Sequence, residues 1–261
     1  MNPLISEFQI PISNVLENMH VINDSQLMVV TVDRSIHNIP LSSSYQARQN
    51  SILKEEIIDT ILFFLPSIPG NVIIFFPSYS YLNECYASWE QQGKLDSLRS
   101  VKPVYREESK MTNAQFGEVV KFLQKAVYER GAVLLAVCRG KASEGIDFSD
   151  AMCRCVIITG IPYPTLTDRK VIMRRQYLDE RNAQQRAFNE RPFSGNDWYT
   201  ISAYRAVNQS IGRVIRHKND FGVILLMDER FGSRDSERYL SRWMQPFYRR
   251  MQSCRCGGER G

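Results

Sequence analysis

The chain has 261 residues, of which 43% are hydrophobic, 11% aromatic and 23% charged. This composition excludes a disordered, collagen-like or coiled-coil chain, and the length allows one large domain or two small ones. The net charge of +5 is divided unevenly: residues 1–138 contain 11 Lys/Arg and 14 Asp/Glu, whereas residues 139–261 contain 22 and 14. Most basic residues of the second half are arginines, whose planar fork suits phosphate, so a polyanion would bind there. A solvated basic surface without a ligand is an equal alternative.

The longest apolar stretch, residues 57–76, is interrupted by Asp59 and by a turn at residues 66–71. It therefore predicts a helix, a turn and a strand rather than a membrane span. The first basic residue is Arg34, so we expect no signal peptide. Six cysteines include no C-x-x-C pair, and we expect reduced thiols, no disulfide and no metal site.

Apolar periodicity divides the chain into three parts. We expect residues 1–44 to lead into the domain, residues 45–250 to form it, and residues 251–261 to be a flexible tail. Helices are predicted at residues 49–65, 79–89, 113–129, 168–185 and 198–216, and strands at 72–76, 101–105, 133–138, 156–159 and 223–227, the last of which closes the sheet. Strands that are apolar throughout and alternate with amphipathic helices indicate an α/β fold, with a mostly parallel sheet covered by helices on both faces.

Three polar residues near the end of the last predicted helix have a spacing that suits phosphate binding. Gln209, Arg213 and Arg216 are spaced i, i+4 and i+7, which predicts one helical face, and Gly212 beside them removes bulk. One amide and two guanidinium groups can grip a polyphosphate, and an arginine offsets the charge that develops on a transferring phosphoryl group. Spacing alone favours the simpler reading, a solvated helix face that pairs with acidic neighbours.

A second segment, residues 139–148, follows the predicted strand that ends at Cys138. It contains Gly140, Lys141, Ser143 and Gly145. Glycines beyond the carboxyl end of a parallel strand allow backbone N–H groups to approach phosphate oxygens. An ordinary turn would need one glycine only, so we favour a binding role.

The sequence contains no G-x-x-x-x-G-K-[ST] motif, because Gly93-Lys94 and Gly140-Lys141 are followed by Leu and Ala. An early acidic pair for Mg²⁺ is also missing, since Asp228 and Glu229 follow the last predicted strand. Arginines of the finger type without a phosphate loop indicate one half of a composite site.

Several segments in the same order resemble the second RecA-like domain of superfamily-two DNA helicases of the XPD class. Residues 138–150 (CRGKASEGIDFSD), 160–164 (GIPYP) and 198–231 resemble motifs V, Va and VI, and residues 73–79 (IIFFPSY) resemble motif IV. Residues 14–30 are similar to the segment that enters this domain. Within the class, the FANCJ-like branch looks nearest and the telomere-length-regulating helicase next.

The resemblance implies roles for individual residues. Arg216 would be the arginine finger, with Arg213 and Gln209 also facing the ATP phosphates, and Gly145 and Asp147 would lie near the nucleotide. Residues on the side of single-stranded DNA would be Ser78, Tyr79, Arg139, Gly140, Lys141 and Ser143. Such contacts address the DNA backbone and read no sequence. Without the resemblance, Tyr79 and Trp198 fit core positions, and Tyr163 fits packing of the turn.

The resemblance also implies an ATP-dependent helicase with 5′-to-3′ polarity, a nuclear location and a role in DNA repair, in which repair proteins are possible partners. ATP and Mg²⁺ would be bound mainly by a first RecA-like domain, which would also carry a 4Fe-4S cluster; the six cysteines here do not fit one. We therefore expect this chain alone neither to hydrolyse ATP nor to unwind DNA. The alternatives are a non-catalytic module that binds DNA or a helicase partner, and a stand-alone α/β enzyme, for which no nucleophile and base are found.

Overall fold

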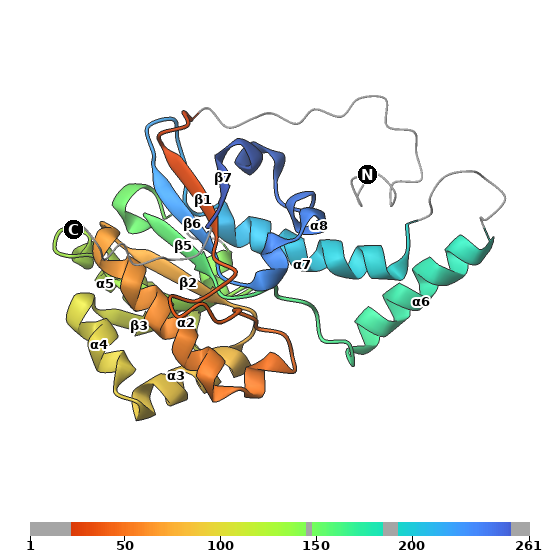
Figure 1. Cartoon of the computed structure of the whole chain (residues 1–261), viewed down its shortest axis with the longest axis horizontal. Coiled ribbons are helices and arrows are strands. Elements are labelled where there is room, and N and C mark those ends of the chain that lie inside the picture. Colours follow the sequence, from red (N-terminus) through yellow and green to blue (C-terminus); the bar gives the residue numbers. More distant parts are fainter. Residues whose placement is uncertain (1–21, 145–147, 185–192, 252–261) are drawn as a thin grey trace, which may run out of the picture.

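The computed structural model describes residues 22–144, 148–184 and 193–251, and their centre is a single parallel sheet (Figure 1). Seven strands follow the order β3-β4-β2-β5-β6-β1-β7. Their bounds are β1 Leu27–Thr31, β2 Val72–Phe76, β3 Val104–Arg106, β4 Val133–Val137, β5 Cys155–Ile158, β6 Gly222–Leu226 and β7 Tyr248–Arg250. This arrangement confirms the predicted α/β fold with a mostly parallel sheet.

The middle of the sheet is buried on both faces, as its sequence predicts. Every residue of β2 is buried, and Ile74 pairs with Leu135 of β4 on one side and Ile157 of β5 on the other. Side chains alternate between two hydrophobic clusters along this strand, since Ile74 and Ile73 belong to different ones. A sheet with apolar side chains on both faces requires helices on both faces.

Helices cover the two faces separately (Figure 1). Against one face pack α2 (Ser51–Phe64), α3 (Tyr79–Gln91) and α4 (Lys94–Val101), and against the other α5 (Asn113–Ala126) and α7 (Gly195–Ile211). Polar side chains begin several of these helices: Thr112 and Gln115 form a capping box on α5, and Ser194 and Asp197 form one on α7.

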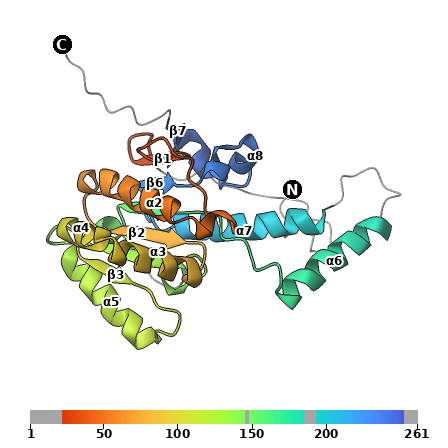
Figure 2. The same ribbon diagram turned by 60° about the horizontal axis from the view of Figure 1, so that its bottom comes forward.

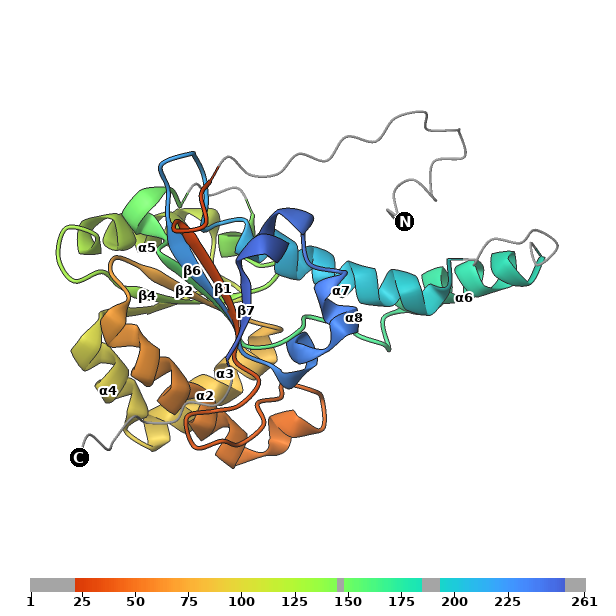
Figure 3. The same ribbon diagram turned by 45° about the horizontal axis from the view of Figure 1, so that its top comes forward.

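One helix, α6 (Arg169–Gln184), stands away from the sheet and forms an arm with the first half of α7, as Figures 2 and 3 show. The backbone N–H of Gly195 donates to Asp179 Oδ1 over 2.8 Å, which fixes the start of α7 against α6. A short helix, α8 (Arg234–Glu237), precedes β7. None of the helices in the described ranges is long and apolar enough to cross a membrane.

The structure differs from the sequence-based expectation in three places. The predicted helix over residues 198–216 is wrong at its end, because α7 stops at Ile211 with Gly212 as its C-cap. The strand predicted at residues 101–105 is β3 at Val104–Arg106, and α4 precedes it. The strand predicted to close the sheet, β6, is followed by β7, and both lie beside β1, which comes from the segment expected only to lead into the domain.

Candidate nucleic-acid and nucleotide interface

The loop that follows β4 lies at the carboxyl edge of the sheet and carries most of the residues expected near DNA. Arg139 has a positive φ of 65°, which turns the chain sharply after Cys138. Gly140 packs closely on Glu107: a Cβ there would lie 2.3 Å from Glu107 Oε1, so the carboxylate would have to shift. The 3-10 turn Lys141–Ser143 follows and ends the described part of this loop at Glu144.

Glu107 organises this edge of the sheet, and sequence reasoning missed it. Its side chain is 0% exposed, and its carboxylate accepts hydrogen bonds from the Tyr79 hydroxyl at 2.5 Å and the Lys141 backbone N–H at 2.6 Å. Burial, together with the Glu107 carboxylate, raises the pKa of Tyr79, so this hydroxyl stays protonated. Glu107 therefore joins two segments that resemble motifs IV and V. The signal that could have found it is its place directly after a strand.

The other polar groups of this loop are partly committed within the protein. Lys141 Nζ lies 3.0 Å from Asn113 Oδ1 at the start of α5. Ser143 is fully buried and donates to the Gly140 carbonyl, so its side chain does not face solvent. Ser78 caps α3 by accepting from the Tyr81 backbone N–H. The hydroxyls of Ser78 and Ser143 thus fix the backbone, and the positive charge of the loop comes from the partly exposed Lys141 and the exposed Arg139.

Arg139 reaches across to other elements of the same edge. Its two terminal nitrogens donate to the Pro162 carbonyl at 3.0 Å and to the Ser202 carbonyl of α7 at 2.9 Å. Beside this contact the rings of Tyr163 and Tyr199 stack with centroids 5.1 Å apart. Tyr163 is partly buried and packs against the hydrophobic core, which agrees with a packing role for this residue of the turn.

The arginines expected to face ATP lie beyond the end of α7, in what we call the arginine turn, residues 212–220. Arg213 donates through Nη2 to the Ser143 carbonyl, which ties the turn to the loop after β4. Arg216 is exposed, and its backbone N–H donates to Asp220 Oδ2 at 3.1 Å. Gln209 is exposed on the last turn of α7. The predicted common helical face is therefore wrong: the three residues are neighbours, but a turn and not a helix places the arginines.

Asp220 holds the arginine turn. This carboxylate is 0% exposed and forms an ion pair of 2.6 Å with Arg154, whose guanidinium also lies 3.9 Å from the Phe221 ring centroid. Asp150, His217 and Asp220 place ligand atoms within 4.8 Å of one another, a grouping that could hold a metal ion. Because Arg154 already neutralises Asp220, an ion pair accounts for the buried charge, and we assign no cation there.

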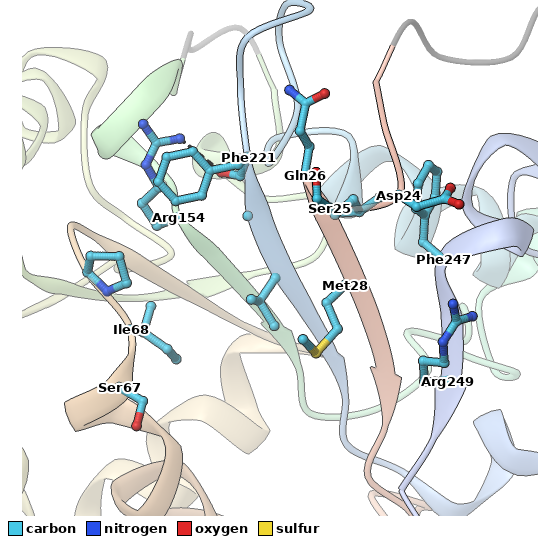
Figure 4. A pocket seen from close by; sticks show the side chains of 14 residues that line it. Asp24, Ser25, Gln26, Met28, Ser67, Ile68, Arg154, Phe221, Phe247 and Arg249 are labelled. Carbon is cyan, nitrogen blue, oxygen red and sulfur yellow. Dashed lines mark hydrogen bonds between the residues drawn. The ribbon is translucent and has the colours of Figure 1, made fainter.

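Arg154 also lines a pocket of about 380 Å³ at the amino ends of β1 and β6. Figure 4 shows Arg154 against Phe221 at one end of this pocket, Met28 in its middle and Arg249 on the far side. None of the residues expected in the site lines it, so this pocket is separate from the loop after β4.

The cysteines of the described ranges offer no nucleophile. Cys85, Cys138, Cys153 and Cys155 are free and buried. Burial raises the pKa of Cys138 and of Cys153 to about 12, so both thiols are protonated at neutral pH. These thiols are packing groups.

The structure thus brings the expected residues into two groups, which lie at opposite ends of the parallel strands. Tyr79, Gly140 and Lys141 meet around Glu107, with Ser78 and Arg139 beside them, at the carboxyl ends of β2 and β4. Arg213 and Arg216 lie at the amino ends of β5 and β6, and Ser143 contacts Arg213. Gly145 and Asp147 lie outside the described residues.

Comparison with known proteins identifies close relatives in sequence. The regulator of telomere elongation helicase 1 homolog of Aedes aegypti is 43% identical over 248 residues, which cover 94% of this chain and 24% of that protein. Its namesake in Drosophila melanogaster is 40% identical over 246 residues, with 94% and 24% coverage. This chain therefore spans about a quarter of the length of these relatives. These relatives carry the name of the telomere-length-regulating helicase, the branch that the sequence motifs placed second after the FANCJ-like branch.

Solved structures and a family model agree on the fold. A structure named XPD helicase superimposes with a TM-score of 0.56 at 23% identity, covering 86% of this chain and 35% of that chain. A structure of XPD in its apo form gives 0.56 at 20% identity, covering 87% and 40%. The model of the helicase C-terminal domain matches residues 61–247. The chain therefore has the fold of the XPD structures, and it belongs to the helicase C-terminal domain family.

Proposed function

We propose that this chain is the half of an ATP-dependent DNA helicase that binds single-stranded DNA and supplies the arginine finger to ATP held by a first RecA-like domain. The observation that supports this proposal is the joining of two groups by one loop: the segment after β4 bears Lys141 at the carboxyl edge and contacts Arg213 through Ser143. The ATP side and the DNA side of the domain are therefore mechanically connected.

On the DNA side, the proposal assigns the backbone of residues 139–141, the Lys141 ammonium and the start of α3 at Ser78 and Tyr79 to the strand. Gly140 is buried close to Glu107, so Arg139 and Lys141 on either side of it supply the accessible groups at this point. Ser143 acts from beneath, because its side chain is buried. Contacts of this kind bind the sugar–phosphate backbone and depend strongly on salt.

On the ATP side, Arg216 would approach the transferring phosphoryl group, with Arg213 and Gln209 nearby. The guanidinium of Arg216 extends from a turn whose backbone is fixed by Asp220, and the residue is exposed. ATP with Mg²⁺ supplies the phosphoryl group, and an arginine next to it offsets the charge that develops. The remaining proposals follow from the family: a 4Fe-4S cluster in the first domain, a nuclear location, 5′-to-3′ movement, and repair proteins as partners.

The test is a chimaera in which this chain replaces the matching segment of the Aedes aegypti relative. We expect turnover of ATP that single-stranded DNA stimulates, and a loss of about 10³-fold or more in the Arg216→Ala variant. The matched control is Arg205→Ala, which removes an exposed arginine from α7.

Three outcomes would contradict the proposal. Unchanged turnover in Arg216→Ala would remove the finger role. Turnover by the 261-residue chain alone would mean that it is a complete enzyme. Salt-sensitive DNA binding by a folded chimaera without any ATP turnover would instead support a non-catalytic module that binds DNA.

A further inference from the structure

The loop after β4 makes three contacts with α7 and with the turn beyond it, which none of the proposed contacts with ligands requires. Cys138 Sγ lies 3.6 Å from Ser210 Oγ, the Arg139 guanidinium donates to the Ser202 carbonyl, and the Ser143 carbonyl accepts from Arg213. Residues 138–143 therefore contact the middle of α7, its last turn and the arginine turn. α7 therefore connects the loop after β4, on the proposed DNA side, with the arginine turn.

Arg139 forms the link furthest from the arginine turn, and it does so with an unusual backbone. Its φ of 65° is in the left-handed region that few residues other than glycine adopt. From this position its two terminal nitrogens bind two carbonyls on different segments, Pro162 after β5 and Ser202 in α7. The two bonds leave from two different nitrogens that the guanidinium holds in one plane, whereas all donors of an ammonium group leave from a single nitrogen.

We propose that Arg139 is a positioning residue that clamps the DNA loop to α7 rather than a residue that grips the DNA strand. In this arrangement, a bound DNA strand that shifts the loop also shifts α7, and the arginine turn at the end of α7 shifts with it. This inference rests on the proposed function, because it explains how DNA binding changes the place of Arg216.

The contact pattern favours this role over a direct grip on phosphate. Two of the five N–H groups of the Arg139 guanidinium already make hydrogen bonds of 3.0 and 2.9 Å to main-chain carbonyls, so a DNA phosphate would meet a side chain that is held on two segments, although the residue is exposed. By contrast, the partly exposed Lys141 donates through Nζ to the Asn113 side chain at the start of α5. The two basic residues thus have different roles: Lys141 attracts the DNA strand, and Arg139 couples the movement of the loop to α7.

The experiment measures ATP turnover of the chimaera against the concentration of single-stranded DNA, for the parent, Arg139→Ala, Arg139→Lys and Lys141→Ala. For both Arg139 variants we expect maximal DNA-stimulated turnover to fall about tenfold, within the range for residues that couple two sites, while the half-saturating DNA concentration changes less than about threefold. For Lys141→Ala we expect the reverse, a higher half-saturating concentration with its maximal turnover largely kept. Arg205→Ala on α7 is the control for loss of one positive charge.

Arg139→Lys is the decisive variant, because it keeps the charge and loses the fork. Recovery of maximal turnover by Arg139→Lys would mean that charge is what matters, and the clamp would be wrong. A rise in half-saturating DNA concentration without loss of maximal turnover would place Arg139 on the strand and overturn the inference. Should Arg139→Ala fail to fold, Arg139→Lys still distinguishes the two roles. A parent chimaera without DNA-stimulated turnover would refute the proposed function itself, independently of Arg139.

Discussion

Two loops of this domain are organised by buried carboxylates, and they use them differently. Glu107 at the carboxyl edge is surrounded by neutral donors, the Tyr79 hydroxyl and backbone N–H groups, and it fixes the backbone of the loop after β4. Asp220 at the opposite edge is paired with the charged Arg154 and accepts from the backbone N–H groups of the exposed Arg216 and of Phe221. Glu107 shapes a backbone surface, whereas Asp220 anchors a turn that presents one side chain.

The physical reason for the difference is the object that each loop would meet. A surface for a sugar–phosphate backbone needs close approach, which Gly140 provides, so the supporting carboxylate touches the loop directly. An arginine finger needs a long side chain on a rigid backbone, and the buried ion pair between Asp220 and Arg154 fixes the backbone of the arginine turn. Substitutions at the two carboxylates should therefore have different energetic signatures.

The largest effect on stability is expected from Asp220→Ala. Removal of this carboxylate leaves the guanidinium of Arg154, whose side chain is 10% exposed, without its buried partner. We expect the free energy of unfolding to fall by about 3–5 kcal/mol, measured by urea denaturation of the 261-residue chain. Asp235→Ala is the control, because its pair with Arg238 is exposed and should contribute little to stability. Equal losses in both variants would show that Asp220 does not anchor the turn.

Glu107→Ala should have the next largest effect. The Tyr79 hydroxyl and the Lys141 N–H are partly buried and lose their common acceptor, so we expect a loss of about 1–3 kcal/mol. Glu108→Ala, at the adjacent exposed position, should change stability by less than about 0.5 kcal/mol. The same urea titration measures both. A loss as small as that of Glu108→Ala would break the comparison between the two carboxylates.

Gly140→Ala tests whether the loop must approach Glu107 closely. The new Cβ would lie 2.3 Å from Glu107 Oε1, and we expect this overlap to cost about 1–3 kcal/mol. The matched substitution is Gly117→Ala in α5, where a Cβ meets nothing within 4 Å and alanine should stabilise the helix by about 0.5–1 kcal/mol. Thermal unfolding of both variants should move in opposite directions; movement in the same direction would refute the close approach.

Tyr79→Phe should have the smallest effect, and the effect should depend on pH. At pH 8 we expect a loss of about 1 kcal/mol for the hydrogen bond to Glu107. The raised pKa of Tyr79 keeps the folded hydroxyl protonated while the unfolded one ionises above its ordinary value of 10.0. The contribution is therefore complete below that value and is lost as the pH rises. The parent and the variant should converge by about pH 11, since one pH unit corresponds to about 1.4 kcal/mol. A constant difference between pH 8 and 11 would contradict the raised pKa.

Much of the fold could be predicted from apolar patterning, but the candidate site only in part. The strand at Val72–Phe76 was predicted at its full length, because a central parallel strand is apolar on both faces. Glu107 was missed, because it lies among charged residues, between the half-buried Arg106 and the exposed Glu108, and its place after the strand β3 is its only local signal. Its burial follows from the parallel pairing of β3 with β4, a contact between segments far apart in sequence.

The end of α7 illustrates the same limit. Val207, Ile211 and Val214 recur at helical spacing, so the sequence pattern extends the helix past Gly212. In the fold, Val214 packs instead against Gly222 at the start of β6, where a Cβ would overlap with its Cγ1 at 2.3 Å. The Val214 side chain would be buried in a longer helix or in the turn, and only the position of β6 selects the turn.

The sequence by itself determined the α/β class, the alternation of the central strands and helices, and the identity of the motifs, because these depend on local periodicity and on short runs of residues. Only the tertiary structure decided that β1 and β7 complete the sheet, that Glu107 and Asp220 are buried beneath the two loops, and that Arg139 binds α7. Each of these depends on the free energy of contacts between distant segments, and such contacts leave no period in the sequence.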